Sequence, residues 1–481
     1  MILSTTYTWG QFIPAFSLVG LAAVILLGDA FLTKLPKRFY GVLAAAGTLF
    51  TCYFLAQGEH ADSFGLLGCI ATLFTILLAM DYTKVSCASL SGSDNEDGTA
   101  ELYALPLVAC AGILCLTQAE DLITLFVSLE VITLTSYVLA GYFRRNQGSV
   151  EAGIKYLVIG AMSTGMLVFG AAWYFGMSGT FALSSHAAHN VLTSAPGIMA
   201  GFLMSVALLF TGAFFKIGAA PMQVWVPDVY QGAPTPVSNF LATASKTAGF
   251  VLFSALISPL TPYLNLGLGG IIVGLLAVVT AATLLIGNLG AIPQGNAKRL
   301  LGYSSIGQAG FILVFYLPLC FGEASYRSVQ SNVMVYLAAY TLATTVAFYA
   351  IAMVRTQRGS EELSAFRGLG KTNPRLAFLI TVAFASLAGV PLTAGFMVKM
   401  LSFFALVDTM GNCMCLAWLL PVMIVCAAAG FYYYFKVIRE MYWVKPAEGD
   451  KPLCVPVISG IVMTICVVAI LLTGTLPLLL N

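Results

Sequence analysis

Charged and metal-binding side chains are scarce in this sequence. Only 9% of its 481 residues are Asp, Glu, Lys or Arg, whereas a soluble domain carries about 25%, so a soluble globular protein is excluded. Eleven cysteines are scattered without a CxxC pair, which excludes the common zinc and redox motifs. Histidine is scarcer still, and we expect no metal site from the three that fall in predicted loops: His60, His186 and His189.

Long apolar runs dominate what is present. Hydrophobic residues make up 59% of the chain, and the mean hydropathy is +0.92. Many runs reach the roughly 20 residues that a spanning helix needs, whereas barrel strands alternate and are only about 10 residues long. The sequence therefore predicts an all-α polytopic membrane protein of about 14 helices, near residues 10–30, 38–57, 64–83, 101–117, 120–143, 149–176, 199–226, 233–257, 266–288, 297–319, 330–355, 374–407, 414–440 and 454–477.

Basic residues are divided unequally between the two sets of predicted loops. Of the 22 Lys and Arg residues, 17 fall on one side, including Lys298 and Arg299, only Arg327 falls on the other, and four lie within spans. Cytoplasmic loops are enriched in Lys and Arg. We therefore expect the basic loops in the cytoplasm and both termini on the outside.

Three of the four intramembrane lysines, and one glutamate, are predicted to lie deep in the membrane. These are Lys216, Lys246, Lys399 and Glu130. A central charge costs roughly 2.5–3.5 kcal/mol on insertion scales, and intramembrane acids and bases often mark proton relays. A static buried pair of Glu130 and Lys216 is the structural alternative. We favour a titrating pair, in which movement of Glu130 changes the affinity of Lys216 for its proton.

The fourth intramembrane lysine, Lys155, has two interpretations. It lies two turns into its predicted helix, four residues after Glu151. A lysine near a helix end can extend to the interface, and an i,i+4 spacing favours an ion pair. Lys155 is therefore either an interfacial ion-pair partner or a lesser member of the relay.

Two predicted helices, the seventh and the twelfth, are too long for one straight span and contain internal breaks. The first break is KIGAAP, with Gly218 and Pro221, and the second is SLAGVPLTAGFMVK, with Gly389 and Pro391. Irregular backbone at membrane depth is tolerated where it is buried in protein or lines a water-filled cavity. We expect the WVPDVYQGAPTPV segment after the first break to be a turn.

The spacing of the two breaks suggests inverted repeats. They lie five helices apart, so units of helices 4–8 and 9–13 would have opposite orientations. Lys216 and Lys399 would then be equivalent. The corresponding division is an N-terminal three-helix segment (1–100), a first repeat (101–260), a second repeat (261–445) and a C-terminal helix (446–481).

Three long motifs carry a family resemblance. They are FKIGAAPMQVWVPDVYQGAPTPVSNFLATASKTAGF, KRLLGYSSIGQAGFILV and ASLAGVPLTAGFMVKM. In this order they resemble the antiporter-like subunits of proton-pumping NADH:quinone oxidoreductase, respiratory complex I, most closely the bacterial N type. The resemblance implies that Glu130 is the acid paired with Lys216, that Lys246 is the connecting lysine, and that Lys399 passes the proton outward.

The polar path between the lysines departs from the family pattern. Related subunits often have histidine where this chain has Gln223 and Gln308. Glutamine can orient water but cannot titrate near neutral pH. Ordered water would then carry the proton past these residues and the neighbouring Ser304 and Ser305.

The resemblance also implies cofactors and partners. NADH, FMN, iron–sulfur clusters and quinone would be held in partner subunits of a translocase in the bacterial inner membrane, and this chain would hold none of them and no metal. One alternative is a subunit of a multi-component cation/proton antiporter. A third interpretation is a structural membrane spacer, which predicts no effect of neutralising Lys216 and Lys399.

Overall fold

A computed structural model of the chain describes residues 9–32, 35–57, 62–91, 100–183, 196–263, 269–321, 325–412, 414–446 and 452–479. The three histidines lie outside these ranges. The described helices are α1 (Ile13–Phe31), α2 (Lys37–Gln57), α3 (Ser63–Ser91), α4 (Glu101–Thr117), α5 (Leu122–Ala140), α6 (Gln147–Ser178), α8 (Pro196–Ile217), α9 (Trp225–Gly232), α10 (Thr235–Ala242), α11 (Ala244–Ile257), α12 (Gly269–Ala291), α13 (Ala297–Leu313), α14 (Tyr326–Arg358), α15 (Leu369–Thr372), α16 (Pro374–Ala388), α17 (Ala394–Asn412), α18 (Leu419–Tyr442) and α19 (Val457–Leu479).

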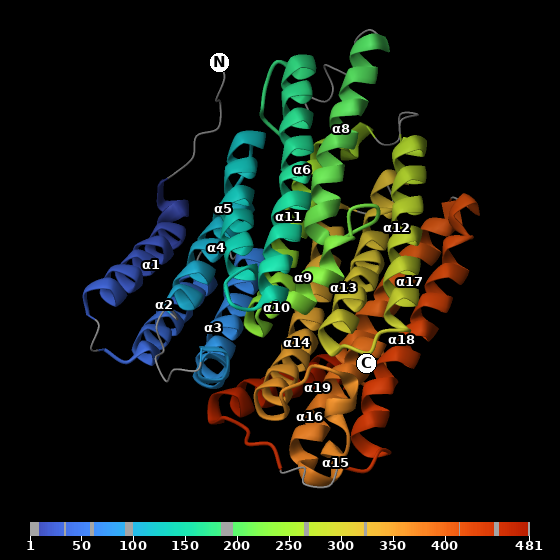
Figure 1. Cartoon of the computed structure of the whole chain (residues 1–481). Coiled ribbons are helices and arrows are strands. Elements are labelled where there is room, and N and C mark those ends of the chain that lie inside the picture. Colours follow the sequence, from blue (N-terminus) through green and yellow to red (C-terminus); the bar gives the residue numbers. More distant parts are fainter. Residues whose placement is uncertain are drawn as a thin grey trace.

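The predicted all-helical membrane fold is confirmed. Within the described ranges, 12 helical segments are long and apolar enough to cross a membrane, and α4 and α16 are shorter apolar helices. Each of the predicted spans contains at least one helix. Helices α1 and α2 lie at one edge of the molecule and α17 and α18 at the other, whereas the last helix, α19, lies back beside α14 (Figure 1).

The centre of the molecule is built from α10, α11 and α14. These helices are buried over almost their whole apolar length, whereas α1, α6 and α18 expose most of theirs. A helix that is apolar all round is buried in a core or in a membrane. The exposed apolar faces of the outer helices therefore meet lipid or neighbouring protein.

Both predicted helix breaks are present and begin at glycine. Helix α8 ends at Ile217 and is followed by Gly218, with φ of 72°, and α16 ends at Ala388 and is followed by Gly389, with φ of 90°. These left-handed conformations are readily adopted by glycine. The seventh and twelfth spans are therefore discontinuous, as predicted.

The structure contains a third break that the sequence does not predict. The eighth span divides at Thr243, which has φ of −111° and ψ of −80° and separates α10 from α11. No glycine or proline lies at this position. The prediction of a turn after the first break was also wrong for its first half, since residues Trp225–Gly232 form the helix α9.

Two isolated β-bridges each join the residue before one helix to a residue after the next helix. Asp121 pairs with Ala182 around α5 and α6, and Asn296 pairs with Glu362 around α13 and α14. Asp121 and Asn296 also cap the first helix of each pair through their side chains. The backbone bonds correspond one to one: Leu122 N to Phe181 O and Leu183 N to Glu120 O in the first pair, Ala297 N to Glu361 O and Leu363 N to Gly295 O in the second.

Replacing Gly218 by alanine should reduce stability more than replacing Gly179. Both glycines have φ of 72°, where alanine costs about 1–2 kcal/mol. A Cβ at Gly218 would lie 2.9 Å from Cγ2 of Val226, whereas one at Gly179 meets nothing within 4 Å. Thermal unfolding of the purified protein in detergent measures both losses, and equal losses would show that the clash with Val226 is relieved freely.

Candidate functional site

Lys216 and Glu130 face the same region but do not form the expected ion pair. The Nζ atom of Lys216 donates a hydrogen bond of 3.1 Å to Thr133 Oγ1. Glu130 Oε1 accepts one of 2.9 Å from Thr164 Oγ1. Thr133 lies one turn after Glu130 on α5, so the lysine reaches the same face of that helix. The two charges still interact electrostatically, but two threonine hydroxyls hold them apart.

Lys246 lies three residues after the break at Thr243 and is almost fully buried. Its Nζ atom donates to the backbone carbonyl of Ser305 on α13 and lies 5.1 Å from the centre of the Tyr340 ring on α14. A carbonyl oxygen and an aromatic face are both favourable to an ammonium group. Lys246, just after the third break, therefore contacts α13 and α14.

Lys399 is held by the end of a helix. Its Nζ atom donates hydrogen bonds of 2.8 Å to both Leu387 O and Ala388 O, and it lies 5.3 Å from the Phe311 ring centre. These carbonyls belong to the last turn of α16, where the break leaves them without helical partners and where the helix dipole favours a cation. The break at Gly389 thus creates the site for the lysine.

Lys216 and Lys399 stand at different distances along the chain from the glycines of their breaks. Lys216 precedes Gly218 by two residues, whereas Lys399 follows Gly389 by ten. The residue two before Gly389 is Leu387, and its carbonyl accepts from Lys399. Leu387 therefore has the same position relative to Gly389 that Lys216 has relative to Gly218. Lys399 approaches this position from the other side of the break.

A hydrogen-bonded network runs from Ser304, the neighbour of the residue that accepts from Lys246, to an acceptor of Lys399. Tyr434 Oη bonds Ser304 Oγ and accepts from Gln308 Nε2 at 3.2 Å. The same Gln308 nitrogen donates to Leu387 O at 3.2 Å. Gln308, Leu387 and Lys399 also line a small internal cavity. The predicted polar residues Ser304 and Gln308 are thus brought together with Lys399.

Buried tyrosines complete this network, and sequence reasoning missed them. Tyr336 Oη donates to Gln308 Oε1, and Tyr230 Oη bonds Ser305 Oγ at 3.3 Å. A buried tyrosine hydroxyl usually finds a hydrogen-bond partner. A tyrosine within an apolar span could therefore have indicated a buried hydrogen bond. Gln223, in contrast, is not joined to the network, because its buried Oε1 has no hydrogen-bond partner.

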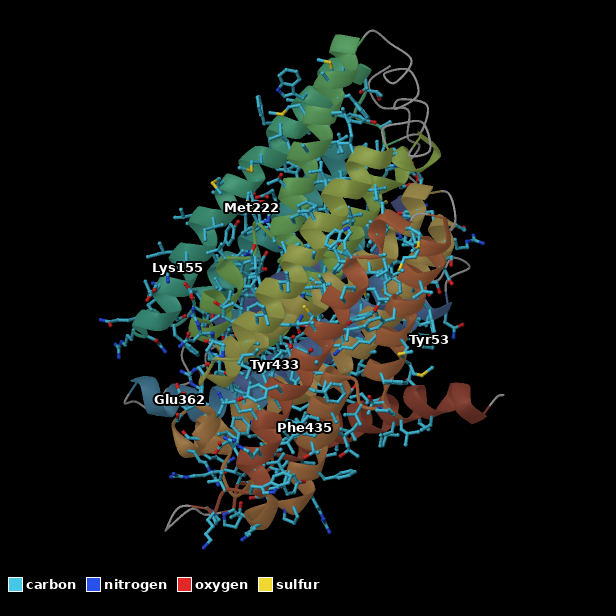
Figure 2. All side chains as sticks on the ribbon, turned by 90° about the vertical axis from the view of Figure 1, so that its right-hand side faces the viewer. Tyr53, Lys155, Met222, Glu362, Tyr433 and Phe435 are labelled. Atoms are coloured by element: carbon cyan, nitrogen blue, oxygen red, sulfur yellow. The ribbon has the colours of Figure 1, made fainter. Side chains whose placement is uncertain are left out.

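Lys155 lies at an ion cluster near the edge of the molecule (Figure 2). Its Nζ atom is 2.6 Å from Glu151 Oε1 and 2.8 Å from Asp228 Oδ2, and Arg299 Nη1 is 2.5 Å from Asp228 Oδ1. Burial alone would raise the pKa of Asp228, but the hydrogen bonds from Lys155 and Arg299 hold that pKa below its usual value. Asp228 therefore fastens α9 to α6 and α13.

Lys298, expected among the loop residues, is completely buried. Its Nζ atom donates to Ala233 O at 2.7 Å and lies 3.0 Å from Glu361 Oε1, which also pairs with Arg355. Burial would raise the pKa of Glu361, but the charges of Lys298 and Arg355 hold that pKa low. The segment after α14 covers the start of α13, which sequence position alone does not reveal.

The described part of the chain contains no group of three or more His, Cys, Asp or Glu side chains that could hold a metal ion. Its chemistry is that of lysines, one glutamate and hydroxyl groups. Such groups bind and pass protons, since each hydroxyl both donates and accepts hydrogen bonds.

The chain is similar to proteins of known families. Residues 119–424 match the family described as NADH:quinone oxidoreductase/Mrp antiporter, TM. NADH-quinone oxidoreductase subunit N of Brevibacillus brevis is 34% identical, over 97% of this chain and 92% of the relative. F(420)H(2) dehydrogenase subunit N of Methanosarcina mazei is 32% identical, over 96% and 95%.

A solved structure extends the similarity to the fold. A chain of respiratory complex I from Thermus thermophilus, solved with bound Aureothin, superposes with a TM-score of 0.75 at 29% identity. The match covers 97% of this chain and 98% of that chain.

Neutralising Asp228 should destabilise the protein with a defined pH dependence. Asp228→Asn removes two partly exposed ion pairs, each worth about 1 kcal/mol or less. Because the native pKa is lowered, this stabilisation is complete above the ordinary Asp pKa of about 3.9 and is lost as the pH falls through the lowered native value. Thermal unfolding of wild type and variant should differ by a constant amount from neutral to mildly acidic pH and converge below it.

The matched control is Glu151→Gln, which removes a more exposed partner of the same Lys155. It should cost less at every pH. A wild-type advantage over Asp228→Asn that grows on acidification would contradict the assignment.

Proposed function

Because the chain belongs to the NADH:quinone oxidoreductase/Mrp antiporter family, we propose that it is the N-type membrane subunit of a proton-pumping NADH:quinone oxidoreductase. It is a multi-pass membrane protein and a subunit of an oxidoreductase complex. Its own activity is to move protons across the membrane while partner subunits transfer electrons to quinone.

The observation that carries this proposal is the row of polar groups that lies between two buried lysines. Lys246 donates to the backbone of Ser305, the adjacent Ser304 bonds Tyr434, and Gln308 continues to the carbonyl that holds Lys399. A lysine buried in a membrane has a large free-energy cost of insertion. A protein that served only as a structural spacer would have no reason to bury two of them. A proton released by Lys246 would be carried by water along this row of polar groups, since a backbone carbonyl and the Gln308 amide orient water but do not titrate.

Glu130 and Lys216 form the input end of the relay. The ammonium of Lys216 rests on Thr133, one turn from Glu130. A small movement of α5 against α8 would exchange this hydroxyl for the carboxylate, which holds a lysine proton more strongly. Opening and closing this pair would therefore load and release the proton on Lys216.

Tyr156 supports the passage from Lys216 to Lys246. Its ring stacks on Phe215, the neighbour of Lys216, at 5.9 Å and on Trp225 at 4.5 Å. Its buried hydroxyl makes no hydrogen bond of good geometry but interacts with Ser245, the neighbour of Lys246. A buried polar group of this kind commonly binds water, which would extend the path between the two lysines.

We further propose that helices 4–8 and 9–13 are inverted repeats, divided near residues 101–260 and 261–445. The matching bridges around α5–α6 and α13–α14 support this division. The excess of basic loops on one side supports a cytoplasmic location for those loops and outward-facing termini, in a bacterial inner membrane.

The redox chemistry belongs to partner subunits. NADH, FMN, iron–sulfur clusters and quinone would be bound there. The relative from Methanosarcina mazei is a subunit of an F(420)H(2) dehydrogenase, so the membrane subunit is compatible with more than one electron donor. Comigration with NADH dehydrogenase activity on a native gel distinguishes this function from that of a multi-component antiporter subunit.

Lys246→Ala should abolish most proton movement through this chain. Removing a positioned acid–base group typically costs a factor of about 10²–10⁴ in the proton-transfer step. Proton uptake into inverted membrane vesicles, divided by NADH oxidation, measures this loss, and native gels verify assembly. Unchanged pumping in a normally assembled complex would rule out a relay role for Lys246.

Tyr434→Phe should slow pumping without disturbing assembly, because it deletes only the hydroxyl between Ser304 and Gln308. Tyr433→Phe is the matched control, since that neighbouring buried hydroxyl donates to Asn288 Oδ1 instead. We expect a larger loss of protons pumped per NADH in Tyr434→Phe. Equal losses in the two variants would exclude Tyr434 from the path.

A further inference from the structure

An apolar groove between α16 and α19 has no part in the proton relay. It has a volume of about 480 Å³, a size within the range of ligand sites, and its walls include Leu376, Leu379, Ile461 and Ile465. Arg375 lies at one end and also lines an adjoining hollow. The groove therefore combines a long apolar wall with a single cation at its mouth.

Arg375 is exposed, and no ion pair or hydrogen bond joins its side chain to another described residue. It occupies the first turn of α16, four residues after the exposed Lys371. This is the end of the helix on the side of the basic loops. The guanidinium is thus available to an anion at the boundary of the membrane.

We propose that this groove binds an anionic phospholipid, with the phosphate on Arg375 and an acyl chain along α16 and α19. A guanidinium matches the geometry of a phosphate through paired N–H donors. Basic pockets between membrane helices on the cytoplasmic side suit anionic lipid headgroups. The groove walls lie on apolar helices, one of them a candidate span, which suits an acyl chain and not a soluble anion.

A second large pocket of the molecule provides a contrast. It is lined by Asp62 and Glu120 and has no basic residue in its wall. Carboxylates at that position would repel a phosphate group. The charge of Arg375 therefore distinguishes the α16–α19 groove as the anionic-lipid site.

The bound lipid would stabilise the position of α16, the first half of the twelfth span. Helix α16 begins beside Arg375 and ends at the carbonyls of Leu387 and Ala388, which hold Lys399. A lipid wedged between α16 and α19 fixes the position of α16 from its outer face. The site is independent of the proton relay, since none of its lining residues belongs to the hydrogen-bonded network.

Native mass spectrometry of the purified complex, supplied with phosphatidylglycerol or phosphatidylcholine, tests the proposal. The wild type should retain phosphatidylglycerol in preference to phosphatidylcholine. Arg375→Gln should weaken this retention about fivefold, as expected for one basic residue at an anionic headgroup. Thr464→Phe, which fills the groove wall, should abolish it. Glycerol 3-phosphate, which lacks acyl chains, should not compete.

Arg145→Gln is the matched control, since Arg145 is exposed in the turn between α5 and α6, away from the groove. It should retain the lipid as the wild type does. Equal retention by Arg375→Gln and Arg145→Gln, or equal retention of the two lipids by the wild type, would overturn the proposal. So would a segment of a partner subunit filling the groove in the intact complex.

Discussion

A lysine inside a membrane must find oxygen acceptors, and in a regular helix the backbone carbonyls are already used. Each deep lysine lies beside a helix end or break, and Lys399 meets the constraint by bonding carbonyls that a break leaves free. Lys216 is the penultimate residue of α8, Lys246 follows the break at Thr243, and Lys399 reaches the last carbonyls of α16. Lys216 instead bonds the Thr133 hydroxyl, and Lys246 bonds the Ser305 carbonyl within α13. The fold therefore accommodates charge at membrane depth by a helix break at Lys399 and by acceptors on neighbouring helices at the other two lysines.

The same constraint accounts for the burial of the central helices. Freed backbone groups and lysines cannot face lipid, and the broken eighth span, which carries Lys246, lies in the interior while continuous helices such as α1 and α6 form the perimeter. The interior then needs hydroxyl groups as well as apolar side chains. Tyr336, Tyr340 and Tyr434 supply them, since each presents a large apolar ring and one polar atom.

The sequence predicts features that depend on local composition. Apolar runs locate the spans, and Gly218 and Gly389 locate two breaks, because glycine adopts the left-handed backbone that ends the helices. The break at Thr243 has no such signal and arises from tertiary packing. The hydrogen-bond partners of the buried lysines also depend on tertiary packing. Lys216 bonds Thr133 and not Glu130, and residues 361–363 cover Lys298. The tyrosine network depends on helices far apart in sequence.

The short helix α9 connects the surroundings of Lys216 with those of Lys246. Trp225 Nε1 donates to Phe215 O, beside Lys216, at 3.0 Å, and Tyr230 bonds Ser305, whose carbonyl holds Lys246. Asp228 ties the same helix to α6. Because α9 is attached on all these sides, it cannot move without altering the surroundings of both lysines. A displacement of α6 would therefore reach the surroundings of Lys216 and Lys246 together.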